Sequence, residues 1–105
     1  MKVQFLFDSS GHWIAFRQGR YVYNVRGDWI GWLAWGDNDV ADVNGEYLGT
    51  IFPGNRFYKR LNRPFRGYPG YPGYPGYPGH PGYPGHAGYS PLPPMTQDVD
   101  GLPRG

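Results

Sequence analysis

The stretch NVRGDWIG (residues 24–31) is one of three copies of a single motif in this chain. The other two copies are DSSGHWIA (residues 8–15) and DVNGEYLG (residues 42–49). Each copy places Asp or Asn first, Gly fourth, an aromatic residue sixth, Ile or Leu seventh, and Gly or Ala last. Because the internal spacing never changes, the motif indicates one structural unit that is copied along the chain.

Each copy contains the residues of a tight β-hairpin turn. An Asp or Asn side chain accepts a hydrogen bond from the backbone two residues further on, and Gly adopts the positive φ that such turns require. We expect these structural turn roles for Asp8, Gly11, Asn24, Gly27, Asp42 and Gly45. The flanking segments are rich in β-branched and aromatic residues, which favour strands. The expected strands lie near residues 3–7, 12–17, 20–25, 28–35, 39–43, 46–52 and 56–60.

A single hairpin of this size cannot bury its apolar face, whereas several copies packed around an axis can. The small residue that ends each motif lets a neighbouring strand or ring approach closely. Closure of the ring, with strand 56–60 meeting strand 3–7, would hide the edges of the sheet. The sequence therefore predicts an all-β fold, a small pseudo-symmetric repeat of hairpins closed around an axis and followed by a disordered tail. The expected boundary separates a repeat domain, residues 1–61, from a basic and Gly-Tyr-Pro-rich tail, residues 62–105.

The motif D/N-x-x-G-x-W/Y-I/L-G/A, carried by about three and a half hairpins, resembles the small bacterial domain called the 4-fold β-flower. The resemblance covers residues 1 to about 60, and the tail lies outside it. It implies a compact, pseudo-symmetric β domain. It implies no established activity, and no functional residues are carried over from it.

The tail begins with a regular repeat, since Gly occupies every third position through eight triplets in residues 67–90. One interpretation is a disordered, partly polyproline-II tether. A second is a low-complexity segment whose tyrosines make weak contacts between many chains. A collagen triple helix is disfavoured, because eight triplets are few and Tyr fills most of the second positions. The tyrosines expected to support self-association are Tyr68, Tyr71, Tyr74, Tyr77, Tyr83 and Tyr89.

Between the two parts lies RFYKRLNRPFR (residues 56–66), which has five basic residues and no acidic one, although the net charge of the whole chain is only +2. We call its cations the basic collar: Arg56, Lys59, Arg60, Arg63 and Arg66. Cations interleaved with aromatic rings can neutralise phosphates while the rings stack on bases or enter a lipid interface. The competing interpretation is a solvated strand end whose charges keep the domain soluble.

Enzyme chemistry finds little support in the sequence. The chain has no cysteine, which excludes disulfides, thiolate catalysis and cysteine-ligated zinc. Neither a phosphate loop, nor a dinucleotide fingerprint, nor a nucleophile elbow occurs. His80 and His86 replace Tyr in the triplet repeat, and His12 occupies a polar turn position. The carboxylates fall mostly in turn positions, where capping explains them better than a cation site does. We therefore expect a non-enzymatic protein without metal or cofactor.

The expected function is that of a protein-interaction or assembly module, in which the tail makes multivalent contacts with a protein partner or with copies of itself. The alternative is a protein that binds nucleic acid or an anionic membrane surface through the basic collar. No small-molecule substrate is indicated. The N-terminal apolar run is too short for a signal peptide, and no window approaches the ~18 apolar residues of a membrane span. A cytoplasmic location is expected, with peripheral membrane association left open.

Overall fold

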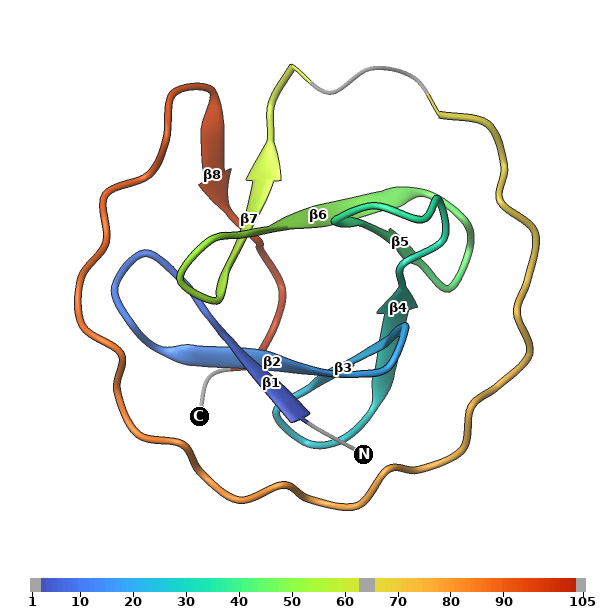
Figure 1. Cartoon of the computed structure of the whole chain (residues 1–105), viewed down its shortest axis with the longest axis horizontal. Helices are drawn as coiled ribbons and strands as arrows, with labels where there is room; N and C mark the ends of the chain where they lie inside the picture. The colour runs from blue at the N-terminus through green and yellow to red at the C-terminus, as the bar shows by residue number, and fades with distance from the viewer. Residues whose placement is uncertain (1–2, 63–65, 104–105) are drawn as a thin grey trace.

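The computed structural model describes residues 3–62 and 66–103, and within these ranges the chain forms eight strands and no helix. The strands are β1 Val3–Phe7, β2 Trp13–Gln18, β3 Tyr21–Asn24, β4 Trp29–Trp32, β5 Asp39–Asp42, β6 Tyr47–Phe52, β7 Arg56–Arg60 and β8 Thr96–Asp98. Each strand pairs antiparallel with the next along the chain. β1 also meets β7 in parallel at Phe7 and Arg56, which closes the sheet on itself (Figure 1). The seven expected strands and the closed all-β ring are thus confirmed.

The three motif glycines adopt the backbone conformation that the turns require. The angle φ is +89° at Gly11, +85° at Gly27 and +88° at Gly45. Each glycine N–H donates a hydrogen bond of 3.0 to 3.1 Å to the carbonyl oxygen of the residue that begins its motif. A side chain at these positions would be strained by the positive φ, so the motif requires Gly for its conformation.

The first residue of each motif caps the same turn with its side chain. The Oδ1 atoms of Asp8, Asn24 and Asp42 each accept a hydrogen bond from the backbone N–H four residues further on, at 2.9, 3.1 and 3.0 Å. Asn24 and Asp42 also accept one from the N–H two residues on, both at 2.9 Å. The predicted turn roles of the motif residues are therefore confirmed.

A β-bulge follows the turn at the same position in each motif. In the first hairpin Phe7 faces Trp13 and Leu6 faces Ala15, so Ile14 is an extra residue without an opposite partner in the ladder. The bulge interrupts the alternation of the strand. As a result Ile14 and its neighbour Ala15 both join the central core, while Trp13 lies in a second, outer cluster.

The central core draws side chains from the three motif hairpins, from β7 and from the residue after β8. They are Leu6, Ile14, Ala15, Val22, Val40, Ile51, Phe57 and Val99. The motif's final small residue allows this packing, as expected. A Cβ atom at Gly31 would collide with the carbonyl oxygen of Ala41, and one at Gly49 would lie 2.9 Å from the Phe57 ring. The core therefore depends on close approach between adjacent hairpins.

The structure differs from the expected disordered tail in two respects. The first is that the tail contains a strand, β8. Lys59 of β7 faces Gln97 of β8, which adds a fourth antiparallel strand pair to the three motif hairpins and adds buried Val99 to the core. Without β8 the outer side of β7 would present unpaired backbone groups to solvent. The sequence prediction missed β8 because TQD is short and poor in β-favouring residues.

The second difference is the path of residues 67–90, which we call the girdle. Instead of leaving the domain, it runs around the outside of the sheet from β7 to β8 (Figure 1). Its glycines from residue 70 to residue 88 all have φ between +81° and +91°, and no atom lies within 4 Å of a Cβ built on any of them. Collagen and polyproline II require negative φ. The triplet glycines are needed for their backbone conformation, which bends the chain at regular intervals.

Candidate functional site

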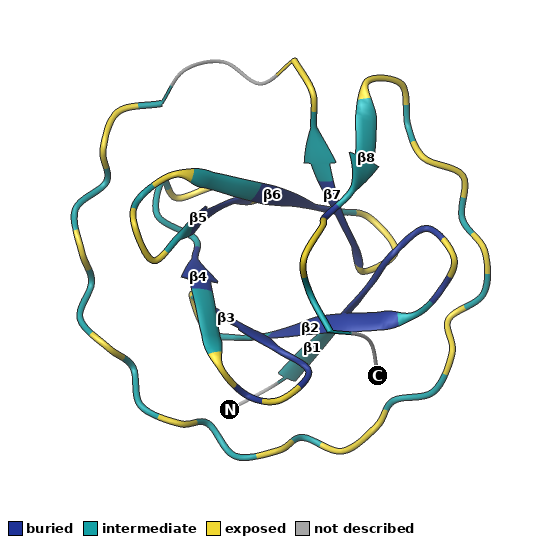
Figure 2. Cartoon of the chain, turned by 180° about the vertical axis from the view of Figure 1, so that it is seen from behind, coloured by how far each residue is buried: buried dark blue, intermediate teal, exposed yellow. Residues whose placement is uncertain are grey.

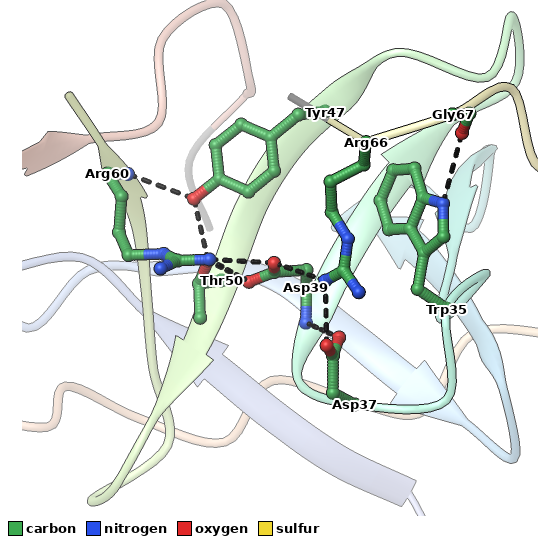
Figure 3. Close-up of polar contacts among 8 residues, drawn as sticks. All are labelled: Trp35, Asp37, Asp39, Tyr47, Thr50, Arg60, Arg66 and Gly67. Atoms are coloured by element: carbon green, nitrogen blue, oxygen red, sulfur yellow. Dashed lines mark hydrogen bonds and ion pairs between the residues drawn. The ribbon is translucent and has the colours of Figure 1, made fainter. Parts of the chain in front are cut away.

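The start of the girdle is held by a cluster of polar and aromatic side chains, which we call the first anchor (Figure 3). Arg66 donates hydrogen bonds of 2.7 Å to both Asp37 and Asp39. Its guanidinium also lies over the Trp35 ring, 4.9 Å from the centroid. The Trp35 indole N–H donates to the carbonyl oxygen of Gly67 at 3.2 Å. The loop between β4 and β5 thereby fixes the first residues of the girdle.

Asp39 is the centre of this anchor, because its buried carboxylate binds two arginines. Arg60 donates to its two oxygens at 2.8 and 2.7 Å, and the Thr50 hydroxyl donates to Oδ1 at 2.7 Å. The Tyr47 hydroxyl contacts Thr50 at 2.6 Å and accepts from the backbone N–H of Arg60 at 2.9 Å. The first anchor therefore contains two cations, Arg60 and Arg66, and two carboxylates, Asp37 and Asp39. Its net charge is close to zero.

The electrostatics of the first anchor follow from these contacts. Burial by itself would raise the pKa of the Asp37 carboxyl, but hydrogen bonds from Arg66 and from the Asp39 N–H hold that pKa below its ordinary value. Hydrogen bonds to Asp37 and then to Asp39 raise the pKa of the Arg66 guanidinium. For Arg60, burial opposes the charge, while hydrogen bonds with Tyr47 and Asp39 raise the pKa. All three groups are stabilised in their charged forms.

The end of the girdle is held by a second anchor, built around Arg56. This side chain is buried and donates to the carbonyl oxygens of Asp8 at 2.8 Å, Gly88 at 3.0 Å and Ala87 at 3.4 Å. The Ala87 N–H donates to the Gly11 carbonyl at 2.9 Å. Arg56 thus links the first hairpin to the end of the girdle.

The same end is tied to β8 through the first motif. The Ser90 N–H donates to the carbonyl oxygen of Ser9 at 2.8 Å. The Ser9 backbone N–H and hydroxyl donate to the two carboxylate oxygens of Asp98 at 2.8 and 2.6 Å. The chain that enters β8 is therefore positioned by the loop of the first hairpin.

Between the anchors, rings of the girdle rest on the turn glycines. A Cβ at Gly45 would lie 2.5 Å from the Tyr68 ring, and one at Gly27 would lie 2.6 Å from the Tyr77 ring. At Gly11 it would lie 2.5 Å from the Gly88 backbone and 2.7 Å from the His86 ring. Tyr68, Tyr77 and His86 are separated by nine residues each, which is three triplets. The girdle therefore advances by one hairpin every nine residues.

The intervening triplets place their rings against the motif tryptophans. Tyr71 and Tyr74 have centroids 5.6 and 5.9 Å from that of Trp29. His80 and Tyr83 lie 5.7 and 6.0 Å from Trp13 in the same way. These separations are those of favourable edge-to-face and tilted aromatic pairs. Trp29 and Trp13 occupy the same position in their motifs, so two hairpins bind the girdle alike.

The outer faces of these rings remain open to solvent. The six girdle tyrosines are between 59% and 76% exposed, although most of them touch the domain. Figure 2 shows the girdle as an alternation of exposed and intermediate residues around the strands. The structure therefore spaces the predicted self-association residues around the perimeter of the molecule.

A family model described as 4-fold beta flower protein matches residues 2–102. The chain belongs to the 4-fold beta flower family. The match to the β-flower continues through the girdle and β8, beyond the first 60 or so residues that carried the resemblance. No curated protein and no solved structure matches this β-flower.

Three of the four basic-collar residues that the structure describes are engaged within the β-flower. Arg56 is buried in the second anchor, and Arg60 and Arg66 are paired with Asp39 in the first. Lys59 lies on β7 opposite Gln97. Arg63 lies outside the described residues. Sequence reasoning missed the pairings of Arg60 and Arg66 because Asp39, the first residue of β5, lies 21 and 27 residues away from them in the chain.

In the described parts of the β-flower, no group of three or more His, Asp or Glu side chains is placed to hold a metal ion. The Nδ1 atoms of His80 and His86 instead each accept a hydrogen bond of 3.1 Å from the glycine N–H two residues on. The same residues include no helix with the length and apolar character needed to span a bilayer.

Proposed function

We propose that this β-flower is a non-enzymatic assembly module whose copies associate through the exposed tyrosines of the girdle. The observation that carries the proposal is the arrangement of six tyrosines, each more than half exposed, at separations of three or six residues along the perimeter. A Tyr ring offers a large amphipathic contact area at a low cost in conformational entropy. Rings that already rest on the domain lose less freedom on binding than rings of a disordered tail.

The arrangement favours several weak contacts over one strong contact. Once one tyrosine binds a neighbouring copy, the others are held close to it, and the effective concentration of the remaining sites rises. We place this activity in the cytoplasm, because a chain without cysteine is compatible with a reducing compartment.

Polyanion binding is the weaker candidate, because three of the five collar cations are engaged within the molecule. Arg56 binds backbone carbonyls, and Arg60 and Arg66 bind a buried carboxylate. Freeing them for a phosphate would leave Asp39 buried without its cations, which is costly. Polyanion binding that salt abolishes would contradict this ranking.

Sedimentation velocity on the full chain, over a wide concentration range at low and high salt, tests the proposal. The sedimentation coefficient is expected to rise with concentration, with little effect of salt. A variant with Tyr68→Ser and Tyr89→Ser, which removes the two most exposed girdle rings, is expected to associate at least several-fold more weakly. The matched control replaces two exposed apolar residues outside the girdle, Val43→Ser and Leu61→Ser, and is expected to behave as the parent. A chain that stays monomeric, or a tyrosine variant that associates like the control, overturns the proposal.

A further inference from the structure

The inner face of the girdle, which is turned towards the domain, contacts the hairpins in a repeating pattern. The hairpins bind the girdle with a repeated set of features, namely a turn glycine and a motif tryptophan. The turn glycines of three motifs accept rings nine residues apart, and the tryptophans of two motifs each accept two further rings. A surface that repeats in register with a peptide repeat is a peptide-binding site, and here it is filled by the chain's own residues.

The chemistry of this site defines its ligand class. The positive φ at each motif turn requires Gly, which has no side chain. An aromatic ring of the girdle can therefore lie directly on the backbone of the turn. The motif tryptophans contact further rings of the girdle. The carbonyl oxygens of Gly11 and Ser9 accept hydrogen bonds from its backbone N–H groups at Ala87 and Ser90. The ligand therefore needs an aromatic residue in every triplet and a glycine with positive φ after it. Within this chain, residues 67–88 have that pattern.

We infer that the perimeter of the hairpins is a binding site for Gly-aromatic-Pro segments, and that the girdle of a second copy of this chain occupies it in trans. The arm that carries the girdle follows β7 and ends with β8, a strand of three residues whose described partner is β7. Transfer of this arm to a neighbour would reproduce every contact of the monomer, which makes exchange of identical elements a low-cost route to a dimer.

The length of the arm permits this transfer. A segment of 24 residues spans roughly 75 Å when extended at about 3.1 Å per residue. The molecule measures 35 × 34 × 22 Å, and the girdle that follows the outside of its own domain has the length to follow that of an identical copy (Figure 1). Binding in cis dominates in dilute solution, because the effective concentration of a tethered segment is on the order of 1 mM. Exchange is therefore expected when chains fold together at a comparable concentration.

This inference goes beyond the proposed function, because it concerns the inner face of the girdle instead of its solvent-exposed face. The two act on different time scales. Contacts between the exposed girdle tyrosines of different copies are expected to dissociate as soon as the sample is diluted. An exchanged dimer must first unpair β8 and release both anchors, so it dissociates slowly.

The test uses full-length chains with two isotope labels, unfolded together and refolded at about 1 mM. The dimer is isolated by size exclusion, and NMR records nuclear Overhauser effects between differently labelled chains. We expect intermolecular cross-peaks between the rings of Trp29 and Tyr74 and a dimer that persists for hours after dilution. A dimer with only intramolecular Trp29–Tyr74 cross-peaks, or no dimer after refolding, overturns the inference.

Three variants separate this inference from the proposed function. Tyr74→Ser removes a ring that rests on Trp29 in the monomer and in the exchanged dimer alike, so by itself it does not shift the balance between the two forms. Refolded together with Trp29→Ala chains, it is expected to raise the fraction of mixed dimer several-fold, because only exchange brings an intact Tyr74 onto an intact Trp29. Tyr89→Ser removes a ring that is 76% exposed, and it is expected to leave the fraction of exchanged dimer unchanged while weakening the rapid association of exposed tyrosines. A mixture of Tyr74→Ser and Trp29→Ala chains with no more mixed dimer than the parent overturns the inference.

Discussion

Gly27 and Gly36 show how one residue type serves two purposes in this protein. Both have positive φ, +85° and +76°. A Cβ at Gly36 would meet no atom within 4 Å, whereas one at Gly27 would lie 2.6 Å from the Tyr77 ring of the girdle. Gly36 is therefore required by its backbone conformation alone, and Gly27 is required also by the ring that rests on it.

This pair predicts different costs for the same substitution. Gly36→Ala is expected to lower the free energy of unfolding by about 1 kcal/mol, the strain of an L-residue at positive φ. Gly27→Ala is expected to cost about 1 kcal/mol more, for the apolar area that the displaced Tyr77 ring no longer buries. Urea unfolding of both variants measures the difference. Equal losses would show that the girdle contributes nothing at this turn.

The carboxylate of Asp37 predicts a pH dependence at the first anchor. Its pKa is lowered in the folded protein, so the stabilisation is complete above the unfolded-state pKa and is lost as the pH falls through the folded-state pKa. We expect the Arg66–Asp37 contact to weaken below about pH 4. The Trp35 indole N–H resonance reports this, because Trp35 stacks on Arg66 and donates to Gly67. Asp37→Asn is the control and should remove the titration. A parent resonance that does not move down to about pH 2 would contradict the prediction.

At the scale of the element, the hairpin is stabilised by a cap that tolerates two residue types. Asn24 and Asp42 accept the same pair of backbone hydrogen bonds in their turns. Asp42→Asn is therefore expected to change the free energy of unfolding by less than ~0.5 kcal/mol. Asp42→Ala removes both hydrogen bonds and is expected to cost about 1 kcal/mol. Thermal and urea unfolding compare the two variants, and an Asn variant as unstable as the Ala variant would rule out the shared capping role.

The bulge is the second feature that defines each hairpin. It lets two consecutive residues enter the core where a regular strand would bury one, and it turns the motif aromatic outward. In the first two motifs that aromatic is a tryptophan, which then receives the girdle. A local irregularity of the strand thereby connects the core to the outer surface.

At the scale of the whole molecule, the girdle is a long connection between β7 and β8 whose length matches the perimeter. Removal of one triplet, Tyr74-Pro75-Gly76, keeps Gly at every third position but shifts every later ring by three residues. Tyr77 and His86 then cannot rest on Gly27 and Gly11 while both anchors hold.

We expect this deletion to open the second anchor. Amide hydrogen exchange at Ala87 and Ser90 should rise by about tenfold or more, because their N–H groups donate to the first hairpin only when the register is correct. Pro75→Ala changes the same triplet without changing the length, and it should leave exchange at both amides close to the parent. Unchanged exchange in the deletion variant would mean that the second anchor closes without help from the register.

The local structure of this protein could be predicted from the sequence because its causes are local. Capping by Asp or Asn, positive φ at Gly, and alternation of apolar residues act within one hairpin, so the motif predicted seven strands, their turns and a closed ring. The need for Gly every third position in residues 67–90 was also visible, but its cause was not. The sequence alone could not distinguish a bent girdle from an extended tether, since both tolerate the same residues.

The remaining features depend on residues that are far apart in the chain. β8 is a strand because β7 offers it an open edge, and its own three residues have little preference for that structure. Arg60 and Arg66 are paired because folding brings Asp39 of β5 to them, and Arg56 is engaged because the end of the girdle lies against it. The composition determined which residues were available for the tail, and the tertiary structure alone decided that their rings would rest on the turn glycines and tryptophans of the hairpins. The physical reason is that a Gly-Tyr-Pro chain has no core of its own, and its conformation is set by the surface that binds it.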